Sequence, residues 1–290
     1  MRRACIDIGS NTTRLLVADC DRGELVDVHQ ERVFTHVGRA RLADGSISQA
    51  KLDELAQVVA EQVDRARELG ATEVRAVATA AIRGAPNGPS LARGVRERCG
   101  IEVEILSWQE EARLAFIGVA RSLPHRPAGE LGVVDVGGGS SELVVGKAPD
   151  QISWAASLPL GSAELTHSCL PSDPPAPDEL TAARREVDSV LDALEVPAPA
   201  QASAVGGSAA SLARLAGTPL DESAFARALK LLSSRRAADL ASEHRLEAER
   251  VRLLPAGLLI LQAASRRFGL PLDVGRGGLR EAILFEGAHV

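Results

Sequence analysis

The chain is poor in aromatic residues, with no Tyr, two Trp and five Phe among its 290 residues. A protein that stacks nucleic-acid bases needs more aromatic side chains than this. The net charge of −6 also gives no basic surface of the kind that attracts nucleic acid. Nucleic acid is therefore not an expected partner, and Trp108 and Trp154 are interpreted as packing residues.

Cysteine pairs and long apolar runs are missing as well. The four Cys residues form no CxxC pair, which argues against a zinc ribbon and predicts reduced, mostly buried thiols. The longest apolar run, Leu253 to Ala264, is shorter than the roughly 18 residues that a membrane span requires. The apolar stretch near the N-terminus is broken by Asp7 and is too short for a signal peptide. We expect a soluble, cytoplasmic protein with no membrane partner.

Two segments of the chain resemble each other. Residues 4–18 read ACIDIGSNTTRLLVA and residues 132–146 read GVVDVGGGSSELVVG, so that Asp7 aligns with Asp135 and Gly9 with Gly137. Each segment is an apolar strand, a glycine-containing turn and a second apolar strand, which predicts a β-hairpin. The length of the chain allows one large domain or two smaller ones, and the repeat favours two like-folded halves.

Strands and helices alternate after each hairpin, which indicates an α/β protein. Residues 48–69 have helical periodicity, with Ser48 as the expected N-cap and Gly70 as the stop. The pattern of residues 202–215 predicts a strand, a turn at Gly206-Gly207-Ser208 and a helix. Residues 221–268 are expected to be mainly helical, and a last helix covers 278–286.

The two hairpin turns carry the first candidate chemistry. The N–H groups of turns such as Gly9-Ser10-Asn11 and Gly137 to Ser140 can bind phosphate oxygens, and glycine allows the backbone to approach closely. Each strand before a turn ends in an Asp, an oxygen ligand suited to a hard cation. Glu142 lies across the second turn from Asp135, which suggests Mg²⁺ or Mn²⁺ held with substrate phosphates. The equivalent position of the first half is Arg14, so the second half is expected to carry more of the metal ligation.

A helix start and a strand end supply further candidates. Glu110 and Glu111 open a predicted helix, and either carboxylate is a candidate base for orienting water. Acidic residues also favour a first helical turn for electrostatic reasons alone. Arg83 follows a predicted strand and offers a bidentate donor set for phosphate.

Eight stretches in the same order resemble the exopolyphosphatase and guanosine pentaphosphate phosphatase (Ppx/GppA) family, in a short two-domain form. They are IDIGSNTTRLLV, VATAAIR, QEEARLAFIGV, VVDVGGGSSELV, LPLGSAELT, AVGGSAASL, LPAGLLIL and GLREAILFE. The resemblance implies two ribonuclease-H-like domains of the actin, sugar-kinase and Hsp70 ATPase type, with an interdomain cleft. We expect the first domain to cover 1–119 and 275–290, and the second to cover 120–274.

The resemblance also implies roles for individual residues. Glu111 corresponds to the catalytic base, and Asp7, Asp135 and Glu142 to metal-associated carboxylates. The residues expected to bind substrate are Ser10, Asn11, Arg83, Gly137, Gly138, Gly139, Ser140, Gly206, Gly207 and Ser208. The chain ends shortly after GLREAILFE, so the further helical domain of long family members is not expected, and processive action on long chains is left open.

The expected reaction is metal-dependent hydrolysis of terminal phosphoanhydride bonds of inorganic polyphosphate, with Mg²⁺ or Mn²⁺ as cofactor and a homodimer as the assembly. The first alternative is hydrolysis of guanosine pentaphosphate or a nucleoside triphosphate. A phosphate-ligand sensor without turnover and a kinase of the same superfamily are further alternatives. The low aromatic content favours a ligand that consists of phosphate alone.

Overall fold

The computed structural model describes residues 1–21 and 24–286, and it divides into two compact units. Within the described residues, unit 1 comprises Met1–Leu114 and residues 279–286, and unit 2 is Ala115–Gly278. These bounds differ by a few residues from those expected, and residues 287–290 of the first predicted domain lie outside the described part. In residues 1–21 and 24–286, no helix combines the length and apolarity needed to cross a membrane.

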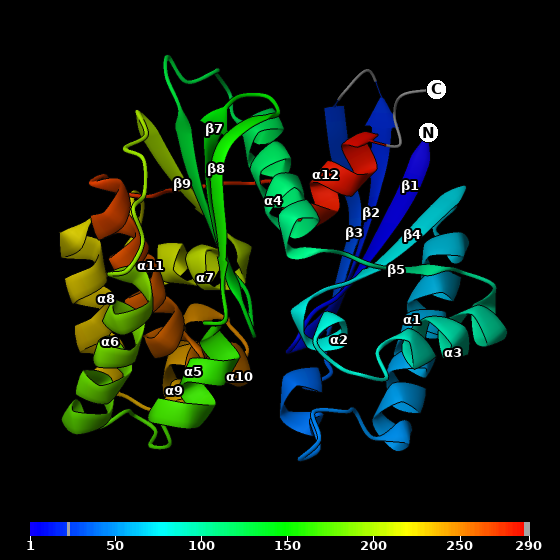
Figure 1. Cartoon of the computed structure of the whole chain (residues 1–290), viewed down its shortest axis with the longest axis horizontal. Helices are drawn as coiled ribbons and strands as arrows, with labels where there is room; N and C mark the ends of the chain where they lie inside the picture. Colours follow the sequence, from blue (N-terminus) through cyan, green and yellow to red (C-terminus); the bar gives the residue numbers. More distant parts are fainter. Residues whose placement is uncertain (22–23, 287–290) are drawn as a thin grey trace. The chain divides into compact units, whose positions relative to one another are not determined.

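Unit 1 is built on a five-stranded sheet with the order β3-β2-β1-β4-β5 (Figure 1). The central strand β1 pairs antiparallel with β2 and parallel with β4. Its elements are β1 (Arg2–Ile8), β2 (Thr12–Asp21), β3 (Glu24–Phe34), the 3-10 helix η1 (Val37–Ala40), α1 (Gln49–Glu68), β4 (Glu73–Ala78), α2 (Ala80–Arg83), α3 (Pro89–Cys99), β5 (Val103–Ile105), the start of α4 (Trp108–Ser122) and α12 (Leu279–Glu286).

Unit 2 repeats this plan with a sheet in the order β8-β7-β6-β9-β10. Its central strand β6 likewise pairs antiparallel with β7 and parallel with β9. Its elements are the rest of α4, β6 (Leu131–Val136), β7 (Ser141–Lys147), β8 (Gln151–Leu158), α5 (Ser162–Cys169), α6 (Pro177–Leu191), β9 (Gln201–Val205), α7 (Gly206–Ala216), α8 (Glu222–Ser234), α9 (Ala237–His244), α10 (Ala248–Arg252), α11 (Leu254–Phe268) and β10 (Asp273–Val274). The predicted α/β fold with two ribonuclease-H-like units is therefore confirmed.

Local sequence signals account for several of these elements. The Ser48 side chain accepts a hydrogen bond from the Lys51 amide and so caps α1, as expected. Gly70 has a φ of +84°, a conformation that ends the helix at low steric cost. The two hairpins predicted from the repeat are β1–β2 and β6–β7.

Two details of the predicted structure are wrong. Gly206 and Gly207 do not form a separate turn, because α7 begins at Gly206 and includes them in its first turn. The strand β10 was not predicted at all. Its two residues pair with β9, and so short a segment leaves no periodic pattern in the sequence.

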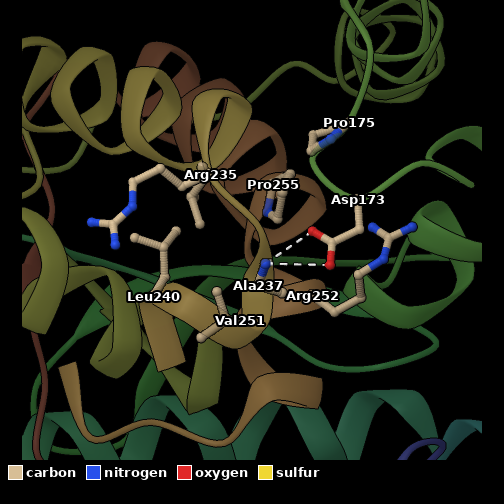
Figure 2. A pocket seen from close by; sticks show the side chains of 9 residues that line it. Asp173, Pro175, Arg235, Ala237, Leu240, Val251, Arg252 and Pro255 are labelled. Atoms are coloured by element: carbon tan, nitrogen blue, oxygen red, sulfur yellow. Dashed lines mark hydrogen bonds between the residues drawn. The ribbon is translucent and has the colours of Figure 1, made fainter. Parts of the chain in front are cut away.

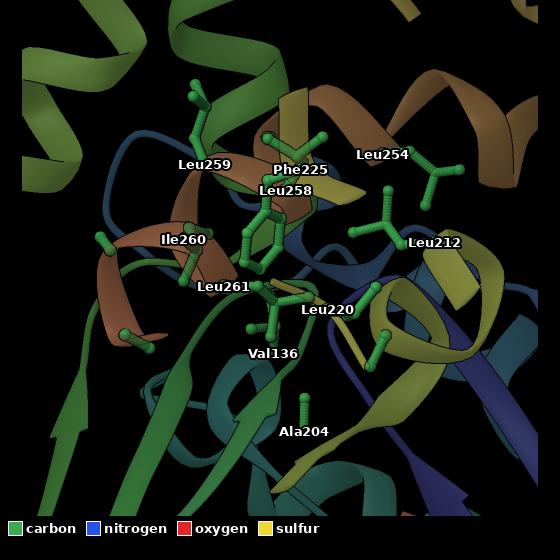
Figure 3. Close-up of a cluster of buried hydrophobic side chains, with 14 of the residues drawn as sticks. Val136, Ala204, Leu212, Leu220, Phe225, Leu254, Leu258, Leu259, Ile260 and Leu261 are labelled. Carbon is green, nitrogen blue, oxygen red and sulfur yellow. The ribbon is translucent and has the colours of Figure 1, made fainter. Parts of the chain in front are cut away.

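The core of unit 2 is centred on α11, which contains most of the longest apolar run in the sequence. The helix is buried along almost its whole length, against the sheet on one side and other helices on the other. Figure 3 shows Leu258 and Leu261 of α11 near Phe225 of α8, with Val136 and Ala204 contributed by the sheet. The run is therefore a core helix, as its length indicates.

In unit 1 both faces of the sheet are covered. Ala4, Ile6 and Ile8 of β1 belong to a core shared with α1 and α3. The alternate residues of β1 point to the other face, where α12 contacts β1, β2 and β3. The Arg3 side chain, which is 7% exposed, donates a long hydrogen bond to the Leu284 carbonyl of α12. The last helix of the described chain thus covers one face of the sheet that contains the first strand.

The backbone of α4 touches the segment just before α12. A Cβ atom added to Gly118 would lie 2.0 Å from the carbonyl oxygen of Gly278, and one added to Gly277 would lie 2.0 Å from that of Gly118. No side chain fits at either position unless the backbone moves. By contrast, a Cβ atom at Gly94 of α3 would make an ordinary contact of 3.5 Å with Ala56.

We expect Gly118→Ala to lower the free energy of unfolding by about 1–3 kcal/mol, because overpacking forces the backbone to shift. The matched change Gly94→Ala, also inside a helix, should raise stability by roughly 0.5–1 kcal/mol through helix propensity. Thermal and denaturant unfolding of both variants measures the difference. Equal stability of the two variants would contradict the proposed steric constraint.

Candidate active site

The turn of the first hairpin is held through its carbonyl groups. The Ser10 carbonyl accepts a hydrogen bond from the Gly38 amide at 2.8 Å. The Asn11 carbonyl accepts from the amides of Thr35 and His36 at 3.0 and 3.1 Å. The side chain of Asn11 is 95% buried, and within the described residues its Nδ2 atom has no hydrogen-bond partner. With its carbonyl oxygens occupied, this turn has N–H groups to offer to a ligand.

The acid before this turn is neutralised by an arginine. Asp7 and Arg14 are cross-strand neighbours in β1 and β2. The Arg14 guanidinium donates through Nη2 and Nε to Oδ2 of Asp7 at 2.6 and 3.2 Å, and the Asp7 side chain is 4% exposed. A cation bound by Asp7 would have to displace this ion pair.

The turn of the second hairpin is held in the same way. The Gly137 carbonyl accepts from the Ser162 amide at 2.9 Å and from its hydroxyl at 3.0 Å. The Gly138 carbonyl accepts from the amides of Ala163 and Glu164 at 3.0 and 3.1 Å. These carbonyls satisfy N–H groups of the first turn of α5, which lack partners inside the helix. A Cβ atom at Gly161 would lie 2.3 Å from the Gly138 carbonyl, so a side chain there would displace the turn.

Two carboxylates face each other where the first half has an ion pair. Asp135 and Glu142 are cross-strand neighbours in β6 and β7. Glu142 is 2% exposed and accepts a hydrogen bond from the Ser157 hydroxyl at 2.8 Å. Gly206 has a φ of +86°, and a Cβ atom there would come within 2.6 Å of Oδ1 of Asp135. The N-terminus of α7 therefore lies against the Asp135 carboxylate, where its partial positive charge stabilises an anion.

The donor set of Asp135 and Glu142 fits a hard divalent cation. Opposed like charges on adjacent strands are unfavourable, and an oxygen-bound Mg²⁺ or Mn²⁺ would relieve this repulsion. Within residues 1–21 and 24–286, no three His, Cys, Asp or Glu side chains are gathered so that they could hold a metal ion. A cation here would have to complete its coordination with water or substrate oxygens. The pairing of Asp7 with Arg14 fits a metal ligand less well.

Glu111 and Arg83, which lie far apart in the sequence, form an ion pair in unit 1. Nη1 of Arg83 donates to Oε2 of Glu111 at 2.8 Å and to the Leu106 carbonyl at 2.9 Å. Arg83 ends the short helix α2, and Glu111 lies in the first turn of α4. Their side chains are 25% and 12% exposed, so both are partly open to solvent.

The neighbouring Glu110 is engaged differently. Arg113 donates to both of its carboxylate oxygens, at 2.6 and 3.0 Å, and these hydrogen bonds lower the pKa of Glu110. Arg113 also pairs with Glu286 of α12 at 2.5 Å. Glu110 thus holds Arg113, which joins α4 to α12, whereas Glu111 contacts the arginine predicted to bind phosphate. The residue pattern alone left these two acids equivalent as candidates, and only the family resemblance singled out Glu111.

Around the N-terminus of α7, the structure adds one residue to those predicted. The guanidinium of Arg250 lies against Gly207, where an added Cβ atom would meet its Cζ at 2.7 Å. Arg250 is 7% exposed. It escaped notice in the sequence because it precedes the LPAGLLIL stretch by several residues and has no motif of its own.

Ser208, also predicted to bind substrate, is fully buried. Its Oγ atom would lie 2.5 Å from a Cβ atom at Gly257 of α11, and within the described residues it has no hydrogen-bond partner. No part of Ser208 is exposed, so its contact with a ligand stays a prediction.

A small pocket of unit 2 lies apart from the predicted residues. Figure 2 shows Asp173 of the proline-rich loop, whose two carboxylate oxygens accept hydrogen bonds from the Ala237 amide at 2.9 and 3.3 Å. Arg235, which points away from Asp173 in this view, pairs with Glu243 at 2.6 Å. We interpret Asp173 as a side-chain cap for the start of α9.

Comparison with known proteins decides the family. The model of the Ppx/GppA phosphatase family matches residues 16–289. The chain belongs to the Ppx/GppA phosphatase family. It is 31% identical to Exopolyphosphatase 1 of Mycobacterium leprae over 98% of this chain and 88% of that protein. It is 30% identical to Exopolyphosphatase 1 of Mycobacterium tuberculosis over 98% of this chain and 87% of the relative.

Solved structures of the family agree with the fold. The Ppx/GppA family member of Aquifex aeolicus has a TM-score of 0.80 at 29% identity, covering 99% of this chain and 97% of its own. An exopolyphosphatase from Cytophaga hutchinsonii has a TM-score of 0.84 at 22% identity, covering 99% and 98% of the two chains. As a member of this family, the chain is a phosphatase.

We expect added Mg²⁺ to raise the Tm of the protein and Glu142→Gln to abolish this rise, because the variant lacks half of the carboxylate pair. Its Tm without Mg²⁺ should fall little, since the change relieves repulsion with Asp135. A ligand at 100 times its Kd stabilises the folded state by about 2.7 kcal/mol.

Asp7→Asn is the comparison variant for this titration. It breaks the ion pair with Arg14 and should lower the starting Tm, but it should keep the Mg²⁺-dependent rise. If Mg²⁺ raised the Tm of Glu142→Gln as much as that of the wild type, Glu142 would not be a cation ligand. If Mg²⁺ no longer raised the Tm of Asp7→Asn, Asp7 would be one.

Proposed function

We propose that this phosphatase hydrolyses terminal phosphoanhydride bonds of inorganic polyphosphate and releases orthophosphate in the presence of Mg²⁺ or Mn²⁺. The observation that carries the proposal is the contact between Glu111 and Arg83. It places a carboxylate that can accept a proton next to a guanidinium that can bind phosphate oxygens. The relatives named exopolyphosphatase support the choice of substrate.

In this proposal the two glycine turns bind the phosphate groups. Their carbonyl oxygens are occupied by neighbouring segments, so backbone N–H groups are what they present to an anion. Ser10 and Asn11 act in one turn. In the other, the Gly137 amide donates to the Ser140 carbonyl at 2.9 Å, so Gly138, Gly139 and Ser140 are the residues proposed to donate to phosphate. The N-terminus of α7, with Gly206 and Gly207, adds a further N–H-rich site.

Glu111 is the proposed general base. It accepts a proton from the water that attacks the terminal phosphorus, and the oxygen that bridges the last two phosphates leaves with the shortened chain. Arg83 holds Glu111 in position before substrate arrives and donates hydrogen bonds to the phosphoryl oxygens, where negative charge accumulates. A divalent cation bound at Asp135 and Glu142 would supply charge neutralisation for the phosphates.

The alternative is hydrolysis of guanosine pentaphosphate or a nucleoside triphosphate. One observation favours it, namely an exposed tryptophan one helical turn from Glu111, at Trp108. The same phosphate-binding groups would serve both substrate classes, since each ends in a phosphoanhydride. We also propose that the protein is a homodimer, as the family resemblance implies, and that it acts in the cytoplasm.

We expect Glu111→Gln to lower kcat on the order of 10²–10⁴-fold, which is the usual contribution of a general base. KM should change little, because the amide keeps the shape of the side chain. The measurement is orthophosphate release with Mg²⁺ from polyphosphates of several lengths, guanosine pentaphosphate and nucleoside triphosphates.

Glu110→Gln is the matched control, since it makes the same chemical change at the adjacent position. It should keep kcat within a few-fold of wild type while losing hydrogen bonds with Arg113. Equal losses in the two variants would show that Glu111 acts through the stability of α4. Wild-type protein that binds these ligands but releases no phosphate would support a sensor without turnover.

A further inference from the structure

His36, which immediately precedes η1, has a left-handed backbone with a φ of +49°. Among the residues that the structure describes, Arg245 is the only other non-glycine residue with a positive φ. A residue with a Cβ atom is strained in this region, whereas glycine is not. Such strain persists only where surrounding contacts hold the residue in place, and it is concentrated at functional sites. The contacts of His36 must therefore offset a strain that glycine would avoid.

Two groups of His36 contact Asn11 of the first glycine turn. The backbone N–H of His36 donates to the Asn11 carbonyl at 3.1 Å, and the ring nitrogen Nδ1 lies 3.2 Å from Oδ1 of Asn11. The ring also stacks on Phe34, with the ring centroids 6.0 Å apart and an angle of 22° between the ring planes. With its left-handed backbone, one residue thus holds both the main chain and the side chain of Asn11.

The hydrogen bond to the ring decides which end of the Asn11 amide is left for a ligand. When Nδ1 of His36 carries the proton, it donates to Oδ1 of Asn11, and the amide group Nδ2 remains. Nδ2 is closed to bulk solvent and has no hydrogen-bond partner among the described residues. Buried donors in proteins are nearly always paired, because an unpaired donor is unfavourable. A phosphate oxygen drawn into the turn would supply the missing acceptor.

We propose that His36 is a positioning residue for the first phosphate-binding turn. Its ring, protonated on Nδ1, holds Oδ1 of Asn11 and so directs Nδ2 of Asn11 to an oxygen of the substrate. The opposite tautomer would accept from Nδ2 and leave Oδ1, an acceptor that cannot bind an anion. The inference rests on the proposed function, because it takes Asn11 as a phosphate-binding residue. His36 acts through Asn11 and does not itself touch the substrate.

The first test removes the ring and keeps the backbone. His36→Gly retains the N–H that binds the Asn11 carbonyl and favours a positive φ, so its Tm should change little. Its kcat/KM for orthophosphate release from tripolyphosphate with Mg²⁺ should fall about tenfold, the scale of a hydrogen bond to a charged group. His36→Asn should recover most of this loss, because Asn offers an N–H near the position of Nδ1 and tolerates the left-handed region.

Arg245→Gly is the matched control, since it relieves the same backbone strain in unit 2. It should leave kcat/KM unchanged. A value of kcat/KM in His36→Gly equal to that of the wild type would overturn the proposal.

A double-mutant cycle tests whether His36 acts through Asn11. Asn11→Ala alone should lower kcat/KM about tenfold or more, because it removes Nδ2. In this background His36→Gly should cause less than about a twofold further loss, since the group that His36 positions is gone. Losses that multiply in the double variant would show that His36 acts independently of Asn11. No loss in Asn11→Ala would show that Nδ2 does not bind substrate, and either result would overturn the proposal.

A binding measurement separates this inference from the proposed function. In the Glu111→Gln background the same cycle is measured on the Kd of tripolyphosphate by calorimetry, with no need for turnover. A non-additive cycle in Kd, without phosphate release from any substrate by the wild type, would reject the proposed hydrolysis and keep the role of His36. Phosphate release together with an additive cycle would reject the role of His36 and keep the hydrolysis.

The protonation of the ring is measured on the wild-type protein. The ¹⁵N resonances of the His36 imidazole, assigned by their absence in His36→Asn, should show a proton on Nδ1. A proton on Nε2 alone would overturn the proposal, because Nδ1 would then accept from Asn11 rather than donate to it.

Discussion

The hydrogen bonds that occupy the carbonyl groups of the two glycine turns are the constraint on which the rest of the site depends. In unit 1 the segment after β3 supplies the donors, and in unit 2 the start of α5, which follows β8, supplies them. Each turn is thus anchored by the chain that follows the third strand of its own sheet. A turn anchored in this way needs no ligand to keep its shape, which suits the proposed binding of phosphate by its N–H groups.

The two halves use this common plan for different chemistry. At one pair of cross-strand positions, unit 1 has Asp7 with Arg14 and unit 2 has Asp135 with Glu142. The first pair joins an acid to an arginine, whereas the second places two acids at adjacent positions. A difference of one side chain is therefore the basis for proposing the cation site in unit 2 and not in unit 1. The two halves share the same backbone arrangement, and they differ in the side chain that faces the Asp across the hairpin.

The sequence could predict the parts of the molecule that leave a local pattern. The two hairpins, the ends of α1 and the order of strands and helices follow from periodicity, capping residues and the internal repeat. Contacts between distant segments leave no such pattern. The pairing of Arg83 with Glu111, the approach of Arg250 to Gly207 and the burial of the Ser208 hydroxyl depend on how helices pack. The exposure of Trp108 was missed for the same reason, since the sequence does not show whether an aromatic residue at the start of a helix is buried or exposed.

The position of α12 on one face of the unit 1 sheet has a consequence for how the protein folds during synthesis on the ribosome. Unit 2 is one continuous stretch of chain. In unit 1, by contrast, one face of the sheet is covered by α12, which comes last in the described chain. Domains generally fold during synthesis as their residues emerge. The N-terminal strands are therefore made first but remain uncovered on the Asp7 face until nearly the whole chain has emerged. Unit 2 has all its residues earlier, so the half of the protein that is translated second is the first that can finish folding.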